Sequence, residues 1–144
     1  MIETIKHMAK LAAQAVQANA ENMTGTELNA EDKYIPEFKM AVAKMNMLER
    51  PVGFVCKSSA GRVVRLLQNY DSSIYTQEPE ELPAQWGFVW SKDPAKALPF
   101  IALSTSPYST GDCCTETGIV YRSLIENNVH APSAYPKGWE VVTE

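Results

Sequence analysis

The chain has 144 residues, of which 45% are hydrophobic and 21% charged, and its formal net charge is −4 at pH 7. This size and composition predict one globular domain or two very small ones. The Lys and Arg residues are scattered and form no run, which argues against nucleic acid as a partner, because proteins that bind it gather a basic face for the phosphates. No apolar stretch approaches the about 20 residues of a membrane-spanning helix, so we expect no membrane insertion. The N-terminus does not resemble a secretory signal, which predicts a protein made in the cytoplasm.

Residues 1–50 have the pattern of a helical region. Between residues 2 and 23, apolar side chains recur at a spacing of three and four, which places them on one face of a helix. Gly25 follows as a stop signal, and a second helix is expected from about residue 35 to 48, with Pro36 in its first turn. We therefore predict a helical hairpin, used for attachment or oligomerisation, whose first helix packs on the second or on another copy of the chain. The apolar face of the first helix consists of Ile5, Met8, Ala12, Ala15 and Val16.

After Pro51 the helical periodicity stops, and short β-prone runs alternate with clusters of Gly, Ser, Asn and Pro. Residues 51–90 hold three such runs, residues 91–107 are proline-containing and expected to be a linker, and residues 108–144 repeat the three-run layout. The sequence thus predicts an α+β fold, with the N-terminal helical hairpin followed by two small three-stranded antiparallel β units. The predicted runs are 52–56, 62–67 and 88–90 in the first unit and 113–114, 119–124 and 139–142 in the second.

The two units also repeat particular residues, which suggests an internal duplication. Each has a glycine, a second glycine seven or eight residues later that closes the hairpin turn, and a tryptophan that follows a proline-containing return. A unit of about forty residues buries little surface, so one large aromatic side chain carries much of its core, and both tryptophans are expected to be buried. These residues are Gly53, Gly61 and Trp86 in the first unit and Gly111, Gly118 and Trp139 in the second.

Four motifs of the second unit resemble a known family. Tyr108-Ser-Thr-Gly111-Asp112, Gly118-Ile-Val-Tyr121, Pro132 and Trp139-Glu-Val-Val142 are similar to the chitin-type carbohydrate-binding modules of family 5/12. The similarity is closer to a variant of this module in proteins of tailed bacteriophages and prophages. It covers residues 108–142 well, and residues 51–90 only as a degenerate repeat in which Arg50, Phe54 and Val64 replace Tyr, Asp and Tyr.

The resemblance implies a non-catalytic virion protein of a tail, fibre, neck or capsid decoration. Such a protein would be made in the host cytoplasm, contact other virion proteins, form a homo-oligomer with a trimer favoured, and use its β units to hold a cell-surface glycan. The family's exposed aromatics after the hairpin strand are replaced by Leu124, Ile125 and Glu126. The remaining candidates for a ligand face are Tyr121, Asn128, His130 and Tyr135, while Tyr108, Gly111, Asp112, Gly118 and Trp139, with Gly53, Gly61 and Trp86, are expected to form the cores and turns of the repeats.

The missing aromatic platform leaves a second interpretation open, in which the chain is purely a protein–protein assembly module or a fibre-assembly factor without glycan binding. An enzyme is not expected, because Glu78, Glu80 and Glu81 lie beside prolines, no motif of a nucleophile or phosphate site is present, and Asp112 is expected to accept backbone N–H groups in its turn. No metal site or other cofactor is expected either. The three cysteines and two histidines lack ligand spacing, and the adjacent Cys113 and Cys114 must point to opposite faces of a strand.

Overall fold

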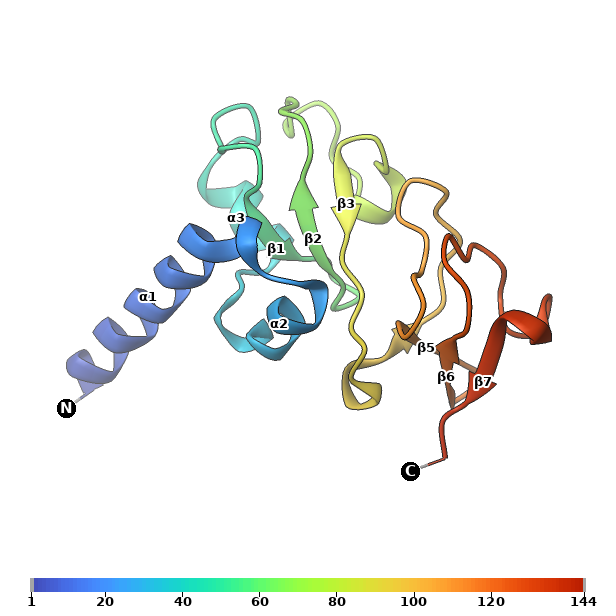
Figure 1. Ribbon diagram of the computed structural model, residues 1–144. Helices are drawn as coiled ribbons and strands as arrows, with labels where there is room; N and C mark the ends of the chain where they lie inside the picture. Colours follow the sequence, from blue (N-terminus) through green and yellow to red (C-terminus); the bar gives the residue numbers. More distant parts are fainter. Residues whose placement is uncertain (1, 144) are drawn as a thin grey trace.

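The computed structural model describes residues 2–143. A helical region comes first, followed by a three-stranded sheet and then a four-stranded sheet, placed side by side in chain order (Figure 1). This architecture confirms the predicted α+β class and the succession of two β units. No helix within residues 2–143 combines the length and apolar character that crossing a bilayer requires.

The helical region consists of three helices rather than two. Helix α1 spans Ile2–Asn19, α2 spans Gly25–Ala30 and α3 spans Phe38–Lys44. Gly25 therefore opens a helix instead of only ending one, because Thr24 and Glu27 form a reciprocal capping box at its start. Helix α3 begins later than predicted, since the residues before it pair with the first sheet: the carbonyl of Pro36 accepts a hydrogen bond of 2.9 Å from the backbone of Lys57.

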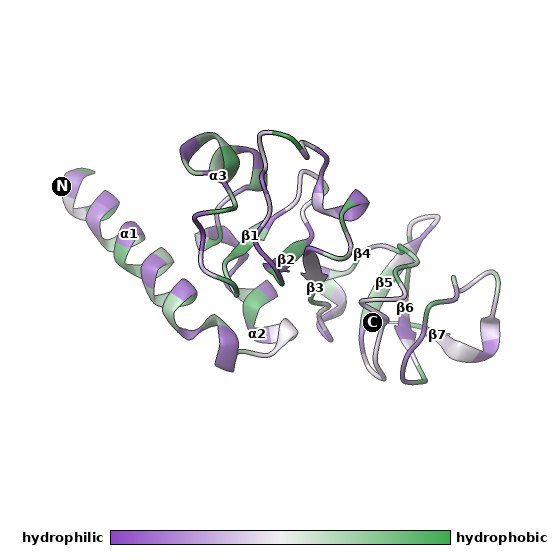
Figure 2. Ribbon diagram, turned by 90° about the horizontal axis from the view of Figure 1, so that it is seen from above, coloured by the Kyte–Doolittle hydropathy of each residue, from purple (hydrophilic) through white to green (hydrophobic). Residues whose placement is uncertain are grey.

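Helix α1 projects from the rest of the molecule (Figures 1 and 2). Of its predicted apolar face only Val16 is buried, while large apolar side chains of the first three turns are between 50% and 69% exposed. The Gln17 amide fixes the C-terminal part, since its Nε2 donates to the carbonyl of Val55 at 2.7 Å and its Oε1 accepts from Val55 N at 3.0 Å. Helix α1 therefore packs on the body only through its C-terminal part, where Val16 shares a buried cluster with Ile35 of the predicted second helix. The exposed side chains are Ile2, Ile5, Met8 and Leu11.

Each β unit contains the predicted antiparallel strands. The first sheet consists of β1 (Val55–Lys57), β2 (Val63–Leu66) and β3 (Trp86–Phe88). The second consists of β4 (Leu98–Pro99), β5 (Cys113–Glu116), β6 (Ile119–Ser123) and β7 (Trp139–Val141). The extra strand β4 pairs parallel with β5 and comes from residues 91–107. That segment is thus part of the second sheet and not a free linker, and the second unit has four strands instead of three.

The two units share one register, which supports the internal repeat. Strands β1 and β2 place Val55 opposite Arg65, and β5 and β6 place Cys113 opposite Arg122. The next pairing places Leu66 opposite Trp86 and Ser123 opposite Trp139. Both tryptophans therefore occupy the same position of the same three-stranded motif.

The predicted turn glycines match as well. The backbone N–H of Gly53 donates to Leu66 and that of Gly111 donates to Ser123, both at 2.8 Å. The φ angles of Gly53, Gly61, Gly111 and Gly118 lie between 80° and 97°, a region that side chains with a Cβ rarely occupy. These glycines are hence turn residues, as the sequence predicted.

Both tryptophans are core residues, as predicted. Trp86 is fully buried and packs edge-on against Phe38 and Tyr70, while Trp139 is 5% exposed and packs against Tyr108. Stacked rings join the two cores. The ring centroid of Trp90 lies 5.8 Å from that of Phe88 in the first core and 4.3 Å from that of Tyr108 in the second. The two units therefore pack as one continuous body.

Candidate functional site

Asn128 does not lie on the expected ligand face. Its side chain is fully buried. The Nδ2 group donates to Ser123 Oγ at 3.0 Å and to the carbonyl of Gly138 at 3.2 Å, and Oδ1 accepts from the backbone of His130. A backbone bridge to Tyr108 holds the same residue from the other side. The buried Asn128 side chain thus stabilises the loop through hydrogen bonds and is not available to a ligand.

Tyr121 also belongs more to the core than to the surface. It lies on β6, opposite Cys114 on one neighbouring strand and Val141 on the other, and is half-buried. Its ring packs against the cluster that contains Tyr108 and Trp139. The residue that the family resemblance suggested as a ligand platform therefore mainly closes the core of the second unit.

His130 and Tyr135 are the two predicted ligand residues that remain exposed together. Their ring centroids lie 5.5 Å apart, and the angle between the ring planes is 60°. Tyr135 is 41% exposed. The loop between them is ordered by Trp139, whose Nε1 donates to the carbonyl of His130 at 2.7 Å. The pair forms a small aromatic shelf that offers two ring edges, an imidazole and a hydroxyl to a ligand.

Asp112 has the structural role predicted for it. It is 7% exposed, its Oδ2 accepts from the backbone of Ser109 at 2.8 Å, and its Oδ1 lies 3.3 Å from Lys92 Nζ. In the first unit, by the shared register, Phe54 occupies this position and Arg50 occupies that of Tyr108. The Arg50 guanidinium lies over the Phe54 ring at 4.4 Å. The first unit has therefore exchanged a buried tyrosine and a carboxylate for a stacked cation–aromatic pair.

The three cysteines are free and buried. Cys113 and Cys114 point to opposite faces of β5, as expected, and Cys114 lies in the core with Tyr108 and Trp139. Burial raises the pKa of the Cys56 thiol, and it raises the pKa of Cys114 to about 12, so both remain thiols at neutral pH rather than the reactive thiolate. Within residues 2–143, no three His, Cys, Asp or Glu side chains are grouped so that they could hold a metal ion.

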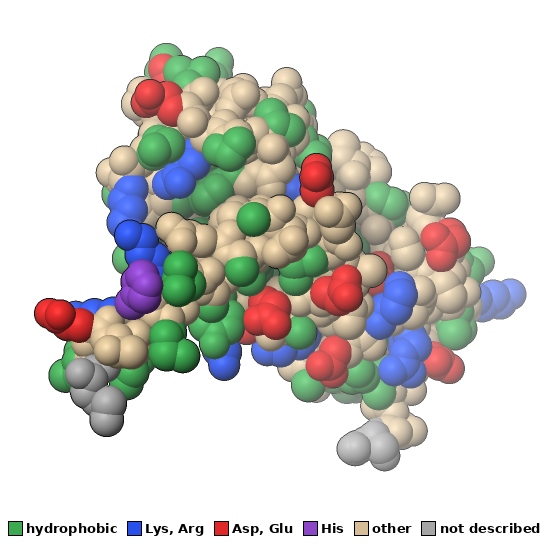
Figure 3. Space-filling view, turned by 60° about the vertical axis from the view of Figure 1, so that its left-hand side comes forward, with side chains coloured by type: hydrophobic (Ala, Val, Ile, Leu, Met, Phe, Trp, Pro, Cys, Tyr) green, Lys and Arg blue, Asp and Glu red, His purple; other side chains and the backbone are tan. Residues whose placement is uncertain are grey.

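A basic cleft lies between α1 and the body of the molecule, and sequence reasoning missed it. Its volume is about 540 Å³, and four basic side chains line it without an acidic neighbour in the lining. Figure 3 shows Lys and Arg side chains gathered on this side of the protein, over the projecting helix and the adjacent segments. We call this feature the basic cleft. Its cations are Lys10, Lys33, Lys44 and Arg50, and its other lining residues include Gln14, Gln17, Tyr34, Pro36 and Phe54.

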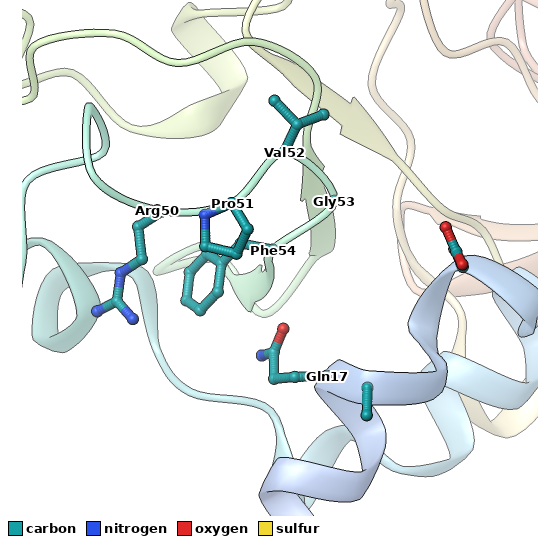
Figure 4. Close-up of a pocket in the computed structure, with 8 residues that line it drawn as sticks. Gln17, Arg50, Pro51, Val52, Gly53 and Phe54 are labelled. Carbon is teal, nitrogen blue, oxygen red and sulfur yellow. The ribbon is translucent and has the colours of Figure 1, made fainter.

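Arg50 connects the basic cleft with two smaller hollows of about 330 and 200 Å³, because it lines all three. Figure 4 shows the first of these, in which Gln17 reaches from α1 toward the loop of residues 50–54. One guanidinium nitrogen, Nη2, donates to the carbonyl of Ala41 at 2.9 Å. Nε is buried and has no hydrogen-bond partner among the described residues. The hydrogen bond to Ala41 thus holds the Arg50 guanidinium in place.

The sequence shows only one part of the basic cleft. The helical spacing of Lys10, Gln14 and Gln17 does predict one polar face on the first helix. The opposite wall combines segments that are distant in sequence, and no run of basic residues marks them. Only the folded chain brings these positive charges together.

Comparison of the chain with models of known protein families, with curated proteins and with solved structures finds no match. The similarity to carbohydrate-binding modules therefore rests on the motifs of residues 108–142 and stays a prediction.

Proposed function

We propose that this chain is a non-catalytic structural and binding protein of a tailed-phage particle, in a tail, fibre or capsid decoration. The observation that carries the proposal is the combination of two β units in one register with a projecting amphipathic helix. Tandem small binding units on an attachment segment suit a protein that links surfaces. The buried thiols, with their raised pKa values, are consistent with a role that needs no nucleophile.

Helix α1 is the proposed attachment and oligomerisation element. Its exposed apolar side chains have no partner within the described chain, whereas Lys6 and Lys10 lie on the opposite, polar face. In proteins most of the stability of a helix comes from tertiary packing of its amphipathic face. Association with other virion proteins or with copies of itself, a trimer being favoured, would bury this stripe.

Contact with other virion proteins is the primary role that we assign to the β units. Two of the four residues expected to face a glycan, Tyr121 and Asn128, are engaged in the core instead. Adhesion to a cell-surface glycan is the second candidate, and the shelf of His130 and Tyr135 favours it. Exposed aromatic side chains can contact the apolar C–H face of a sugar.

The primary role is tested with particles produced by the strain that carries the gene. Particles purified by density gradient should contain the chain in a fixed ratio to the major capsid protein, measured by quantitative mass spectrometry. Antibody labelling in electron microscopy should then place it on the tail, fibre or capsid. Its absence from washed particles that contain all other structural proteins would show the proposal to be wrong.

Glycan adhesion has a separate test. If the second candidate holds, chitin and bacterial cell-wall polysaccharide retain the protein, and the double variant His130→Ala with Tyr135→Ala loses retention. The matched control is Tyr75→Ala, because Tyr75 is an exposed tyrosine of the first unit, 53% exposed. Lack of retention on every polysaccharide tried would leave assembly as the role of the β units.

A further inference from the structure

We propose that the basic cleft binds an acidic peptide segment of a partner protein. The inference rests on the proposed function, since it names the chemistry of the surface that an assembly partner presents to this chain. It concerns the polar side of α1 and is distinct from both the apolar stripe and the shelf of His130 and Tyr135.

The charges of the basic cleft are not neutralised within the protein. Among residues 2–143, the four ion pairs involve other cations, and none includes a basic side chain of the cleft. Carboxylates do lie near its rim, since Glu21 and Glu37 line the two adjoining hollows. Four like charges around one hollow repel one another, and this is notable in a chain of net charge −4. Such a concentration of positive potential attracts an anionic ligand and steers its approach.

The aromatic rings of the cleft are already covered by cations, which disfavours a sugar as the occupant. Lys33 Nζ lies 5.0 Å from the centroid of the Tyr34 ring, and the Arg50 guanidinium lies over Phe54 at 4.4 Å. Stacking of a sugar would have to displace these contacts. The rings instead support the cations and hold them in place for a charged ligand.

The distribution of the donors favours a peptide over a single phosphate group. The cations come from α1, from the turn before α3, from the end of α3 and from the loop of residues 50–54, so they surround the hollow instead of meeting at one point. An extended segment with several carboxylates can satisfy such separate donors. Gln14 adds an exposed amide, which can pair with a peptide backbone. A hollow of about 540 Å³ is within the range of clefts that hold compact ligands.

Fluorescence anisotropy with fluorescein-labelled hexaglutamate tests the proposal on the full chain. The peptide should bind at low ionic strength and weaken as salt is added, because screening reduces the attraction. The double variant Lys10→Gln with Lys44→Gln should lower the affinity about fivefold or more. A control of equal charge change, Lys39→Gln with Lys137→Gln, should leave it nearly unchanged, because neither residue lines the cleft. Circular dichroism melts of both variants check that the fold is retained.

Three results would overturn the proposal: no binding of hexaglutamate, equal loss in the two double variants, or stronger displacement by the oligonucleotide dT6 or a trigalacturonate than by unlabelled hexaglutamate. The last result would assign the cleft to a phosphate backbone or an acidic glycan. Failure here is distinguishable from failure of the proposed function, since incorporation into purified particles is measured without any peptide.

Discussion

At the scale of single residues, the indole N–H groups of the two core tryptophans have different hydrogen-bond acceptors. In the second unit Trp139 Nε1 donates to a backbone carbonyl, whereas in the first Trp86 Nε1 donates to the hydroxyl of Tyr70 at 3.0 Å. Both groups of the latter pair are buried. A buried N–H that loses its acceptor retains the cost of desolvation without the hydrogen bond.

Tyr70→Phe should therefore lower the free energy of unfolding by about 1–3 kcal/mol, although it removes only one oxygen atom. The matched control is Tyr75→Phe, which removes the same atom from a ring that is 53% exposed and should change stability little. Chemical denaturation at neutral pH measures both variants. Equal effects of the two substitutions would contradict the assigned role of the Tyr70 hydroxyl.

The residues of the cores and turns were predictable, and the basic cleft was not. Gly53 and Gly111 could be recognised because a turn position with a positive φ angle is usually occupied by glycine. Asp112 could be recognised because a carboxylate beside such a turn accepts local N–H groups. Lys44, in contrast, carries no local signal, and the spacing of Lys10 predicts only a polar helix face, since charged residues on helices normally face solvent. Their approach depends on how α1 leaves the body of the protein.

At the scale of elements, strands were predicted better than helices. The strands of each unit follow from β-prone runs bounded by turn residues, and the observed bounds differ by only a few residues. Helix α3 was predicted too long, because the residues flanking it are drawn into the sheet and the core: Pro36 bonds to Lys57, and Met47 is fully buried. Strand β4 was not predicted, because a strand of two residues is too short to show an alternation of apolar and polar side chains. Tertiary contacts overrode local preference in both cases.

The exposed apolar side chains of α1 form the proposed oligomerisation surface. Ile5→Lys together with Met8→Lys should abolish self-association while leaving the melting temperature of the β units nearly unchanged. Both side chains are more than 60% exposed and contribute little to the monomer, whereas burial between copies would be prevented by the added charges. Sedimentation velocity measures the assembly state and calorimetry measures the stability.

A control for this pair is Gln14→Lys, which adds charge to the polar face of the same helix. It should leave the sedimentation coefficient unchanged. A wild-type protein that sediments as a monomer at every concentration would contradict oligomerisation through α1. Attachment of the helix to another virion protein would then be the remaining role of the stripe.

At the scale of the whole molecule, a shared aromatic column couples the two β units. Trp90 stacks between Phe88 and Tyr108, and its Nε1 donates to the carbonyl of Ser106 at 2.9 Å. The same ring packs against both the first and the second core. Arg62 adds a polar link, since it pairs with Glu80 at 2.9 Å and donates to the carbonyl of Pro99 beside the second sheet. Units of this size have little core of their own, so their stability depends on this junction.

Trp90→Ala should therefore do more than remove one side chain. The loss of packing alone is expected to cost about 3 kcal/mol, and because the lost ring belongs to both cores, the single cooperative unfolding transition expected of the native chain should separate into two. Differential scanning calorimetry distinguishes these outcomes through the ratio of calorimetric to van't Hoff enthalpy. Tyr135→Ala removes an aromatic ring from the exposed shelf and should preserve one transition with little change in midpoint. A single transition in Trp90→Ala, merely shifted to lower temperature, would mean that contacts such as the Arg62 link suffice to couple the units.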